Sequence, residues 1–174
     1  MSLRCDLNIN GGSRRVLLVA KDEETPEHLA LRLTAAILFF DGEPALDVGP
    51  DDPALTDIGF MPDLMVPDGA GGIAVWVECG NVAENKLTKV ARRIKDGRLV
   101  ILKESVESGR RQRAVIEREI RNGEKIEVWA WPKEEFAKWK AAITESNYVF
   151  GEASGASLNL VLNETAFGTQ LTAC

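Results

Sequence analysis

The stretch Val75–Asn81, VWVECGN, begins as an apolar run and ends on a glutamate, a cysteine and a glycine. Such a run is typical of a buried strand, in which alternate residues face opposite sides of the sheet. Trp76 and Glu78 therefore share one face with Gly80, and Cys79 lies on the other. Burying an unpaired carboxylate is costly, so we expect Glu78 to have a partner. A salt bridge to a following lysine is the simplest one.

Strand and helix patterns alternate on both sides of this stretch, over residues 73–142. This alternation predicts an α/β core with some parallel pairing. On the C-terminal side we expect, in order, a helix over Ala83–Lys95, a strand in DGRLVILKE (96–104), a basic helix from Gly109 to a C-cap at Gly123, a strand in KIEVWAW (125–131) and a helix that begins at Pro132.

On the N-terminal side, MPDLMV (61–66) predicts a short strand after a loop rich in Gly, Pro and Asp. Before that loop, Thr25 and Pro26 predict the start of a helix that runs to Phe40. Hairpin signals lie at both ends of the chain, in LRCDLNI and RRVLLVA around NGGS, and in NYVFG followed by ASLNLVL. These hairpins would add antiparallel edges to a mixed sheet. With no repeat and no linker, one domain over residues 1–174 is expected.

The composition excludes disordered and membrane-spanning classes, since hydrophobic residues make up 45% and charged residues 28% of the chain. The longest apolar run, AAILFF, is far too short to span a bilayer. The first ten residues contain no apolar segment of the secretory type. Three widely spaced cysteines match no metal or disulfide pattern. We therefore expect a reduced, cytoplasmic setting and no membrane partner.

The net charge of −6 argues against binding nucleic acid by bulk attraction, but the charge is unevenly distributed. Residues 86–125 hold 13 Lys and Arg against 6 Asp and Glu, a net charge of +7; the remainder holds 8 against 21, a net charge of −13. This basic segment is either a solvated helical face or a surface that holds a polyanion beside an acidic pocket. Arginines 110, 111 and 113 are expected to open a helix, where the dipole disfavours cations, and this favours an anionic partner.

An acidic pair emerges when MPDLMV is read together with VWVECGN. Asp63 follows Pro62 and lies about one strand length before Glu78. Acids on neighbouring strands of a hairpin can meet at one end of a sheet, where they would repel each other without a cation. Mg²⁺ binds one or two carboxylates together with water and substrate phosphate. A divalent-metal site at Asp63 and Glu78 is therefore a second interpretation of the buried glutamate.

Phosphodiester hydrolysis also requires a cation near the attacking water or the phosphate. In the nuclease pattern Pro-Asp…(Asp/Glu)-x-Lys this cation is a lysine two residues after the acid, the position that Gly80 occupies here. The next candidates are Lys86 and Lys89 on the following helix. On a helical wheel Lys86 flanks the buried face, whereas Lys89 points further towards solvent.

The order and spacing of four segments resemble those of the YaeQ family, of the PD-(D/E)XK nuclease-like superfamily. These segments are DEETPEHLALRLTAAILFF, MPDLMV, VWVECG and NKLTKVARR. The residues that match the family pattern are Glu24, Glu27, Arg32, Pro62, Asp63, Trp76, Glu78, Gly80, Lys86 and Lys89. The resemblance covers most of the chain. It departs from the family in a shorter N-terminal hairpin, an Asp-rich loop before Asp63, and a missing proline after Gly80.

The resemblance implies an α/β fold of the restriction-endonuclease type, in which a mixed sheet has flanking helices. It implies Asp63 and Glu78 as ligands of Mg²⁺ (or Mn²⁺), with Glu27 holding a metal-bound water or a second ion. Residue-for-residue matching assigns the displaced lysine to Lys89, whereas the helical wheel favours Lys86. The implied activity is metal-dependent hydrolysis of nucleic acid. The candidate backbone contacts are Arg32, Arg92, Arg93, Arg110, Arg111 and Arg113.

Two other hypotheses fit the sequence. One is a nuclease-fold module that binds or regulates without cleaving, and the other is a structural protein in which Glu78 makes a salt bridge. His28 is the only histidine, which excludes histidine relays, and we expect it to be an ordinary polar residue on the first helical turn. Cys79 is expected to be a core thiol. Trp129 and Trp131 should share one sheet face, covered by a helix rather than stacked on bases.

Overall fold

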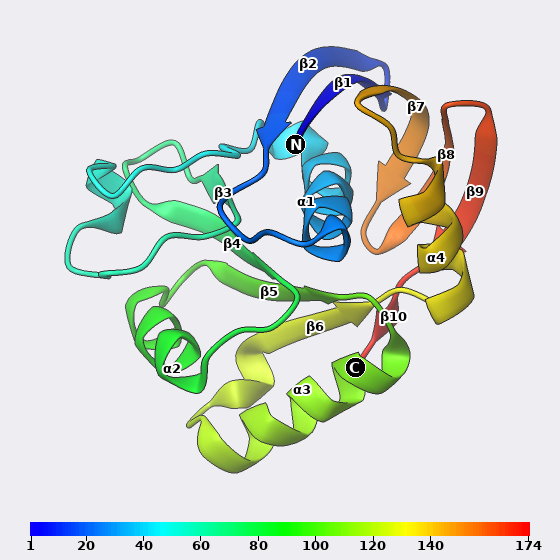
Figure 1. Ribbon diagram of the computed structural model, residues 1–174. Coiled ribbons are helices and arrows are strands. Elements are labelled where there is room, and N and C mark those ends of the chain that lie inside the picture. Colours follow the sequence, from blue (N-terminus) through cyan, green and yellow to red (C-terminus); the bar gives the residue numbers. More distant parts are fainter.

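Two five-stranded sheets and four α-helices make up the fold (Figure 1), described for residues Met1–Cys174 in a computed structural model. The first sheet has the order β2-β1-β7-β8-β9 and the second β10-β6-β5-β4-β3. The strands are β1 (Ser2–Ile9), β2 (Gly12–Val19), β3 (Leu64–Pro67), β4 (Ile73–Cys79), β5 (Arg98–Lys103), β6 (Ile126–Ala130), β7 (Ser146–Ser154), β8 (Ser157–Leu162), β9 (Thr165–Gln170) and β10 (Thr172–Ala173).

The helices alternate with these strands through the middle of the chain. They are α1 (Pro26–Leu38), α2 (Glu84–Arg93), α3 (Val106–Glu119) and α4 (Lys133–Ala142), with short 3-10 turns η1 (Phe40–Gly42), η2 (Pro53–Leu55) and η3 (Gly123–Lys125). None of the helices is both long and apolar enough to cross a membrane.

The second sheet confirms the α/β core. Strands β4, β5 and β6 run parallel, and β3 pairs antiparallel with β4 as a hairpin. Each central strand is buried on both faces, as expected for parallel strands covered by helices. On one face, Trp76 packs in a core of 12 buried residues, some of which come from α2 and α3. On the other face, Val77 and Cys79 belong to a core of 30 buried residues. The alternation expected along VWVECGN is confirmed from Trp76 to Cys79, but Gly80 lies beyond the strand, and a Cβ there would face His28 and Leu31 of α1 instead of the side of Glu78.

The antiparallel hairpins expected at both ends of the chain are present, but they form a sheet of their own instead of adding edges to the sheet of β3–β6. Strand β1 pairs parallel with β7 from Arg4↔Ser146 to Ile9↔Gly151, which joins the two ends of the chain. The physical reason is that alternate residues of β1 and β7 are apolar and need cover. Helix α1 supplies it, since the larger core contains residues of α1 and of both sheets (Figure 1).

Two strands, β9 and β10, follow the pair with which we expected the chain to end. The segment of β9, TAFGTQ, has only one large apolar residue, Phe167, so its sequence carries little strand signal. Both Trp129 and Trp131 pack against the larger core, which confirms that they share a sheet face. Trp131 and Trp139 of α4 lie with ring centroids 5.4 Å apart, so a helix does cover this face.

Helix α3 begins earlier than its sequence suggests. Ser105 is the N-cap and accepts a hydrogen bond from the backbone N–H of Ser108, so the helix starts at Val106 rather than at Gly109. Arg110 and Arg111 therefore lie in the second turn, and the argument from the helix dipole for an anionic partner fails. At the other end, the left-handed residue is Asn122, with φ of 57°, and not the expected Gly123.

Candidate functional site

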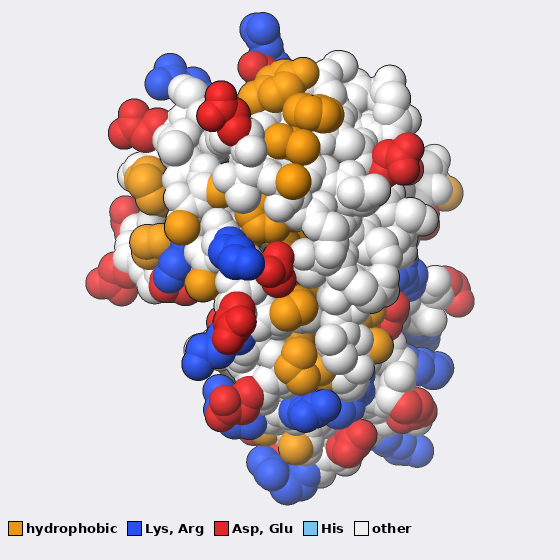
Figure 2. Space-filling view, turned by 90° about the vertical axis from the view of Figure 1, so that its right-hand side faces the viewer, with side chains coloured by type: hydrophobic (Ala, Val, Ile, Leu, Met, Phe, Trp, Pro, Cys, Tyr) orange, Lys and Arg blue, Asp and Glu red, His pale blue; other side chains and the backbone are white.

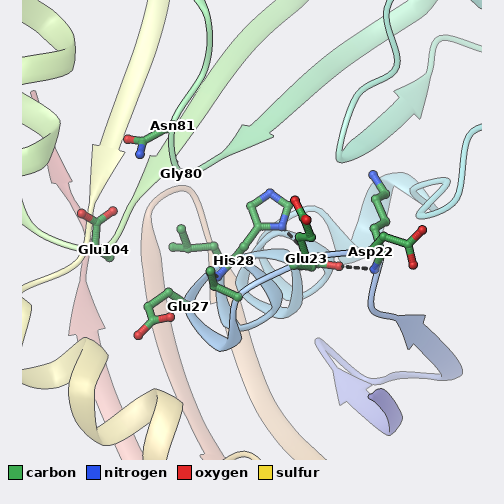
Figure 3. A pocket seen from close by; sticks show the side chains of 11 residues that line it. Asp22, Glu23, Glu27, His28, Gly80, Asn81 and Glu104 are labelled. Carbon is green, nitrogen blue, oxygen red and sulfur yellow. Dashed lines mark hydrogen bonds and ion pairs between the residues drawn. The ribbon is translucent and has the colours of Figure 1, made fainter.

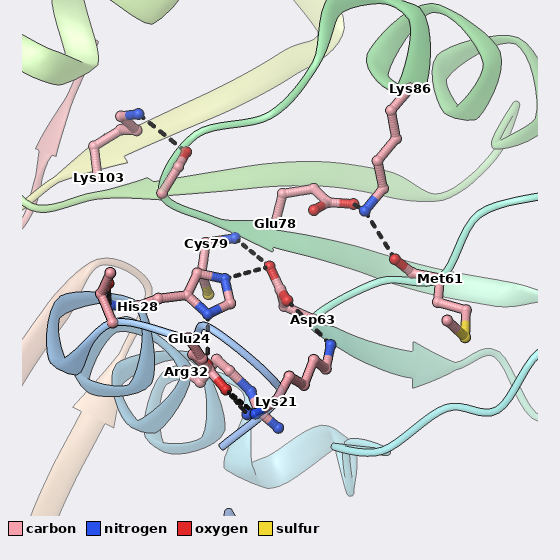
Figure 4. A network of polar contacts seen from close by, with 12 residues as sticks. Lys21, Glu24, His28, Arg32, Met61, Asp63, Glu78, Cys79, Lys86 and Lys103 are labelled. Carbon is pink, nitrogen blue, oxygen red and sulfur yellow. Dashed lines mark hydrogen bonds and ion pairs between the residues drawn. The ribbon is translucent and has the colours of Figure 1, made fainter. Parts of the chain in front are cut away.

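Glu78 lies at the end of β4 and is almost completely buried, with 3% of its surface exposed. Its Oε1 atom accepts a hydrogen bond from the Trp76 indole N–H at 2.7 Å and lies 2.7 Å from Nζ of Lys86 (Figure 4). Burial raises the pKa of the Glu78 carboxyl, against the opposing effect of Lys86. Its other oxygen, Oε2, has no hydrogen-bond partner in the chain and still reaches solvent.

Asp63 lies directly before β3, opposite Glu78 on the hairpin, because Leu64 pairs with Val77. Its Oδ2 atom accepts hydrogen bonds from the backbone N–H of Cys79 at 2.8 Å and from Nε2 of His28 at 3.2 Å. Burial would raise the pKa of the Asp63 carboxyl, but the contacts with His28, Cys79 N–H and Lys21 lower it. Its Oδ1 atom makes only a loose 3.7 Å contact, with Nζ of Lys21.

The two carboxylates interact electrostatically, since the charge of Asp63 contributes to the raised pKa of Glu78. Each keeps one oxygen, Oδ1 or Oε2, without a hydrogen bond from the chain. Such a pair fits the donor set of Mg²⁺, which takes one or two carboxylates and fills its octahedron with water and phosphate oxygens. No group of three or more carboxylate, imidazole or thiol side chains lies close enough together to hold an ion. Most ligands of a metal would therefore come from water and substrate.

The backbone explains why no lysine follows Glu78 on the strand. Strand β4 ends at Cys79, and Gly80 adopts φ of +74°, in the left-handed region that favours glycine. A lysine at position 80 would either have a strained backbone at this φ or change the backbone path after β4. Lys103 lies next to this point on β5, because Cys79 pairs with Leu102, and its Nζ donates to the carbonyl of Gly80 at 3.0 Å.

Lys103 is buried although it has no carboxylate partner. Only 2% of its surface is exposed, and besides Gly80 it donates to Oδ1 of Asn81 at 3.1 Å. Burial lowers the pKa of its ammonium group, partly offset by Glu104. Leu99, Ile101 and Lys103 alternate on β5, so Lys103 faces the same side of the sheet as Glu78.

The structure separates the two lysines expected on the next helix. Lys86 reaches inward to Glu78 and also donates to the carbonyl of Met61 at 2.9 Å, as the helical wheel predicted. Lys89 lies on the outer side, 5.6 Å from the ring centre of Phe60. The geometry thus favours Lys86 over the residue-for-residue match.

Other expected site residues lie apart from this pair. Glu27 is 46% exposed at its side chain and pairs with Lys140 of α4 at 2.6 Å, so the structure does not place it with Asp63 and Glu78. Arg32 is buried and paired with Glu24 at 3.0 Å and Asp47 at 3.3 Å, out of reach of a nucleic acid.

The arginines of the basic segment differ in their surroundings. Arg111 pairs with Glu107 at 2.8 Å, and Arg113 donates to the carbonyls of Gly123 and Cys174 at 3.0 Å and to that of Ile126. Both therefore have partners within the chain. The other three arginines that we expected to contact nucleic acid from this segment, Arg92, Arg93 and Arg110, have no such partner and are exposed.

His28 contacts two carboxylates, a role that we did not expect from the sequence. Its Nδ1 lies 2.5 Å from Oε1 of Glu24 and its Nε2 faces Asp63, so the protonated ring can donate to a carboxylate from each nitrogen (Figure 4). The contact with Asp63 raises the pKa of His28, and Glu24 adds to this effect. The expectation of an ordinary polar residue is wrong. The sequence did contain one indication of this role. Glu24, His28 and Arg32 are spaced four residues apart, so they line up along one face of α1 and the residues just before it.

A pocket of about 520 Å³ lies beside this network, between the start of α1 and the end of β4 (Figure 3). Its lining is strongly acidic and contains a single hydrophobic residue, Leu31. The lining residues are Lys21, Asp22, Glu23, Glu24, Thr25, Glu27, His28, Leu31, Gly80, Asn81 and Glu104. Neither Asp63 nor Glu78 lines this pocket, but Gly80 and Asn81 place it next to Lys103 and the end of β4.

Comparison with known proteins identifies relatives of this chain. A family model described as YaeQ protein matches residues 13–166. Two crystal structures are similar in fold, those of the YaeQ proteins from Xanthomonas axonopodis pv. citri and Pseudomonas syringae, each with a TM-score of 0.73 at 18% sequence identity. The match covers 99% of this chain and 96% and 94% of those chains, respectively. No curated protein matches the sequence.

Proposed function

The chain belongs to the YaeQ family, and we propose that it is a metal-dependent phosphodiesterase of the PD-(D/E)XK type that acts on nucleic acid. The observation that carries this proposal is the pair of carboxylates on neighbouring strand ends, Glu78 buried and Asp63 partly buried, with one oxygen of each left without a hydrogen bond. Burial raises the pKa of Glu78, so its ionised form is unfavourable for stability. Groups with such raised pKa values cluster at functional sites.

The residues around the pair have distinct roles in this proposal. Asp63 and Glu78 hold Mg²⁺ or Mn²⁺, which when bound activates a water and offsets charge on the phosphate. His28 keeps Asp63 ionised and fixes its orientation through the 3.2 Å contact. Lys86 neutralises Glu78 in the free protein, and its flexible stem allows the ammonium group to turn to the substrate phosphate.

Lys103 is a second candidate for the missing strand lysine. It lies beside Gly80 on the same sheet face as Glu78. Its backbone belongs to a strand of the sheet, as that of the missing strand lysine would. Glu27 remains a candidate for a metal-bound water only if its pair with Lys140 opens. We assign the positioning of the phosphate to Lys86 and the support of the Gly80–Asn81 turn to Lys103.

The nucleic-acid backbone is proposed to contact the exposed cations of the basic segment. Arg92, Arg93 and Arg110 have no partner in the chain and are free for phosphate contacts, whereas Arg111 and Arg113 are engaged. The opposite side of the molecule is unsuited to a polyanion. Figure 2 shows few charged side chains over β7–β9, and Glu164 is the only charged residue between Ala153 and Cys174.

A Mn²⁺ titration followed by electron paramagnetic resonance tests the site directly. We expect binding to the unmodified protein and its loss in Asp63→Asn and Glu78→Gln, with Glu117→Gln as the acidic control on the exposed side of α3. Cleavage is then assayed on single-stranded and duplex DNA and RNA with Mg²⁺. Binding that survives in both variants would refute the metal site.

The second candidate is a nuclease-fold module that binds or regulates without cleaving. The observation that favours it is that Lys86 and His28 already contact both carboxylates, so the pair has counter-ions without a metal. This candidate expects tight nucleic-acid binding that is indifferent to EDTA and to Glu78→Gln, with no cleavage. The phosphodiesterase proposal expects cleavage that both treatments abolish.

A further inference from the structure

Cations without partners gather at one place in the fold. Nine of the 21 Lys and Arg side chains make no hydrogen bond or ion pair with the chain. Six of these nine lie on the second half of α2, just after it, or in the loop between α3 and β6. They are Lys89, Arg92, Arg93, Lys95, Arg121 and Lys125.

Four of the six line a single cavity of about 650 Å³ between α2 and the loop that follows α3, towards the lower left of Figure 1. Its cations are Arg92, Lys95, Arg121 and Lys125, and its hydrophobic lining consists of Ala91, Ile94, Leu99, Ile120 and Ile126. The only acid is Glu119, which is paired with Arg118 at 2.8 Å. The cavity therefore combines an apolar floor with an excess of positive charge.

Helix geometry explains only part of this arrangement. Arg92 lies in the last turn of α2, where the dipole favours a cation, but Arg121 and Lys125 lie beyond the end of α3. All four cations are exposed, and together they create a positive potential around the cavity that attracts anions. The volume is within the range of small-molecule sites, which are mostly apolar with a few convergent polar groups.

We propose that this cavity binds a nucleoside di- or triphosphate, with the phosphates among the four cations and the base and ribose on the apolar floor. No aromatic residue lines the cavity, so it lacks the stacking platforms on which single strands are held. The site shares Arg92 with the proposed nucleic-acid surface but no residue with the carboxylate pair. Lys86 in the first turn of α2 contacts Glu78, whereas Arg92 in the last turn lines the cavity, six residues and about 9 Å further along the helix axis.

Isothermal titration with ATP and with tripolyphosphate tests the proposal without involving the metal site. The full-length chain carries Asp63→Asn, and the buffer contains EDTA. The test variant is Arg92→Gln/Arg121→Gln. The matched control, Arg4→Gln/Lys133→Gln, removes the same charge from two unpartnered cations that do not line the cavity.

ATP should bind more tightly than tripolyphosphate, because only ATP covers the apolar floor. The cavity variant should weaken ATP binding by at least about tenfold, and the control by less than about twofold, since charge-assisted hydrogen bonds to phosphate are lost only in the first. Four results would overturn the proposal. They are no ATP binding at millimolar concentration, equal affinity for ATP and tripolyphosphate, equal weakening in both variants, and binding there of an oligonucleotide but not of ATP.

Discussion

Replacing Lys86 with methionine removes the ammonium group at Glu78 while keeping a side chain of similar length. The Nζ–Oε1 distance of 2.7 Å corresponds to a Coulomb attraction of about 6 kcal/mol at an effective dielectric constant of about 20. Desolvation offsets part of this, and the Lys86 side chain is 21% exposed. Since breaking a buried pair typically costs about 3–5 kcal/mol, we expect Lys86→Met to lower the free energy of unfolding by about 2–3 kcal/mol at pH 8.

The loss should depend on pH with a defined sign. Burial already raises the pKa of Glu78, and without Lys86 it rises further. The folded state of the variant therefore retains a proton that the unfolded state releases, so its stability falls as pH rises above the unfolded pKa of Glu78. At pH 5, where protonation relieves the buried charge, the difference from the unmodified protein should shrink to about 1 kcal/mol or less.

Urea unfolding at pH 5 and pH 8 measures this difference, with Lys89→Met as the control on the outer side of the same helix. Lys89 lies only near the Phe60 ring, so its loss should cost less than about 1 kcal/mol at either pH. Adding Glu78→Gln to Lys86→Met should recover most of the stability at pH 8. Equal effects of the two lysine variants, or a penalty for Lys86→Met that does not change with pH, would refute the assignment of Lys86 as the counter-ion of Glu78.

Three further predictions concern neighbouring features. The contact with Asp63 raises the pKa of His28, so this pair stabilises the fold fully below about pH 6.5 and less as pH rises through the pKa of the folded state. Thermal melts from pH 5 to 9 should show this loss of stability, and His28→Gln should remove it. Gly80→Ala should cost about 1–2 kcal/mol because of its positive φ, although its Cβ would meet no atom closer than 3.7 Å; a smaller loss in chemical unfolding would contradict the strain. Arg113→Met should cost about 2–3 kcal/mol through its lost contacts with backbone carbonyls, whereas Arg110→Met should be neutral within about 0.5 kcal/mol; similar midpoints for both would show that these contacts contribute nothing.

Local periodicity was enough to predict the core of the second sheet. The alternation of Trp76 with Val77 and Cys79 and the helical position of Lys86 depend on neighbours a few residues away, and the structure confirms both. The strand-helix order predicted parallel pairing, which β4, β5 and β6 show. These features follow from patterns with periods of 2 and 3.6 residues, which a single sequence displays.

Contacts between distant segments could not be obtained in this way. His28 meets Asp63 across 35 residues, and only the packing of α1 against the β3–β4 hairpin brings them together. Lys103 is likewise placed beside Gly80 by the register of β5 on β4. The sequence marked Gly80 as the position of an absent lysine, but the left-handed backbone that excludes one there became visible only in the fold.

The parallel pairing of β1 with β7 has a consequence for how the chain is made. The first strand leaves the ribosome early and α1, which follows at once, can cover its apolar face, but its pairing partner β7 comes more than 130 residues later, so one edge of the N-terminal hairpin has to wait unpaired. Strands β3 to β6 and helices α2 and α3 come from one continuous segment and can assemble meanwhile. Closing such a long loop is slow, so completing the first sheet should limit the folding rate and leave the nascent chain dependent on chaperones during that interval.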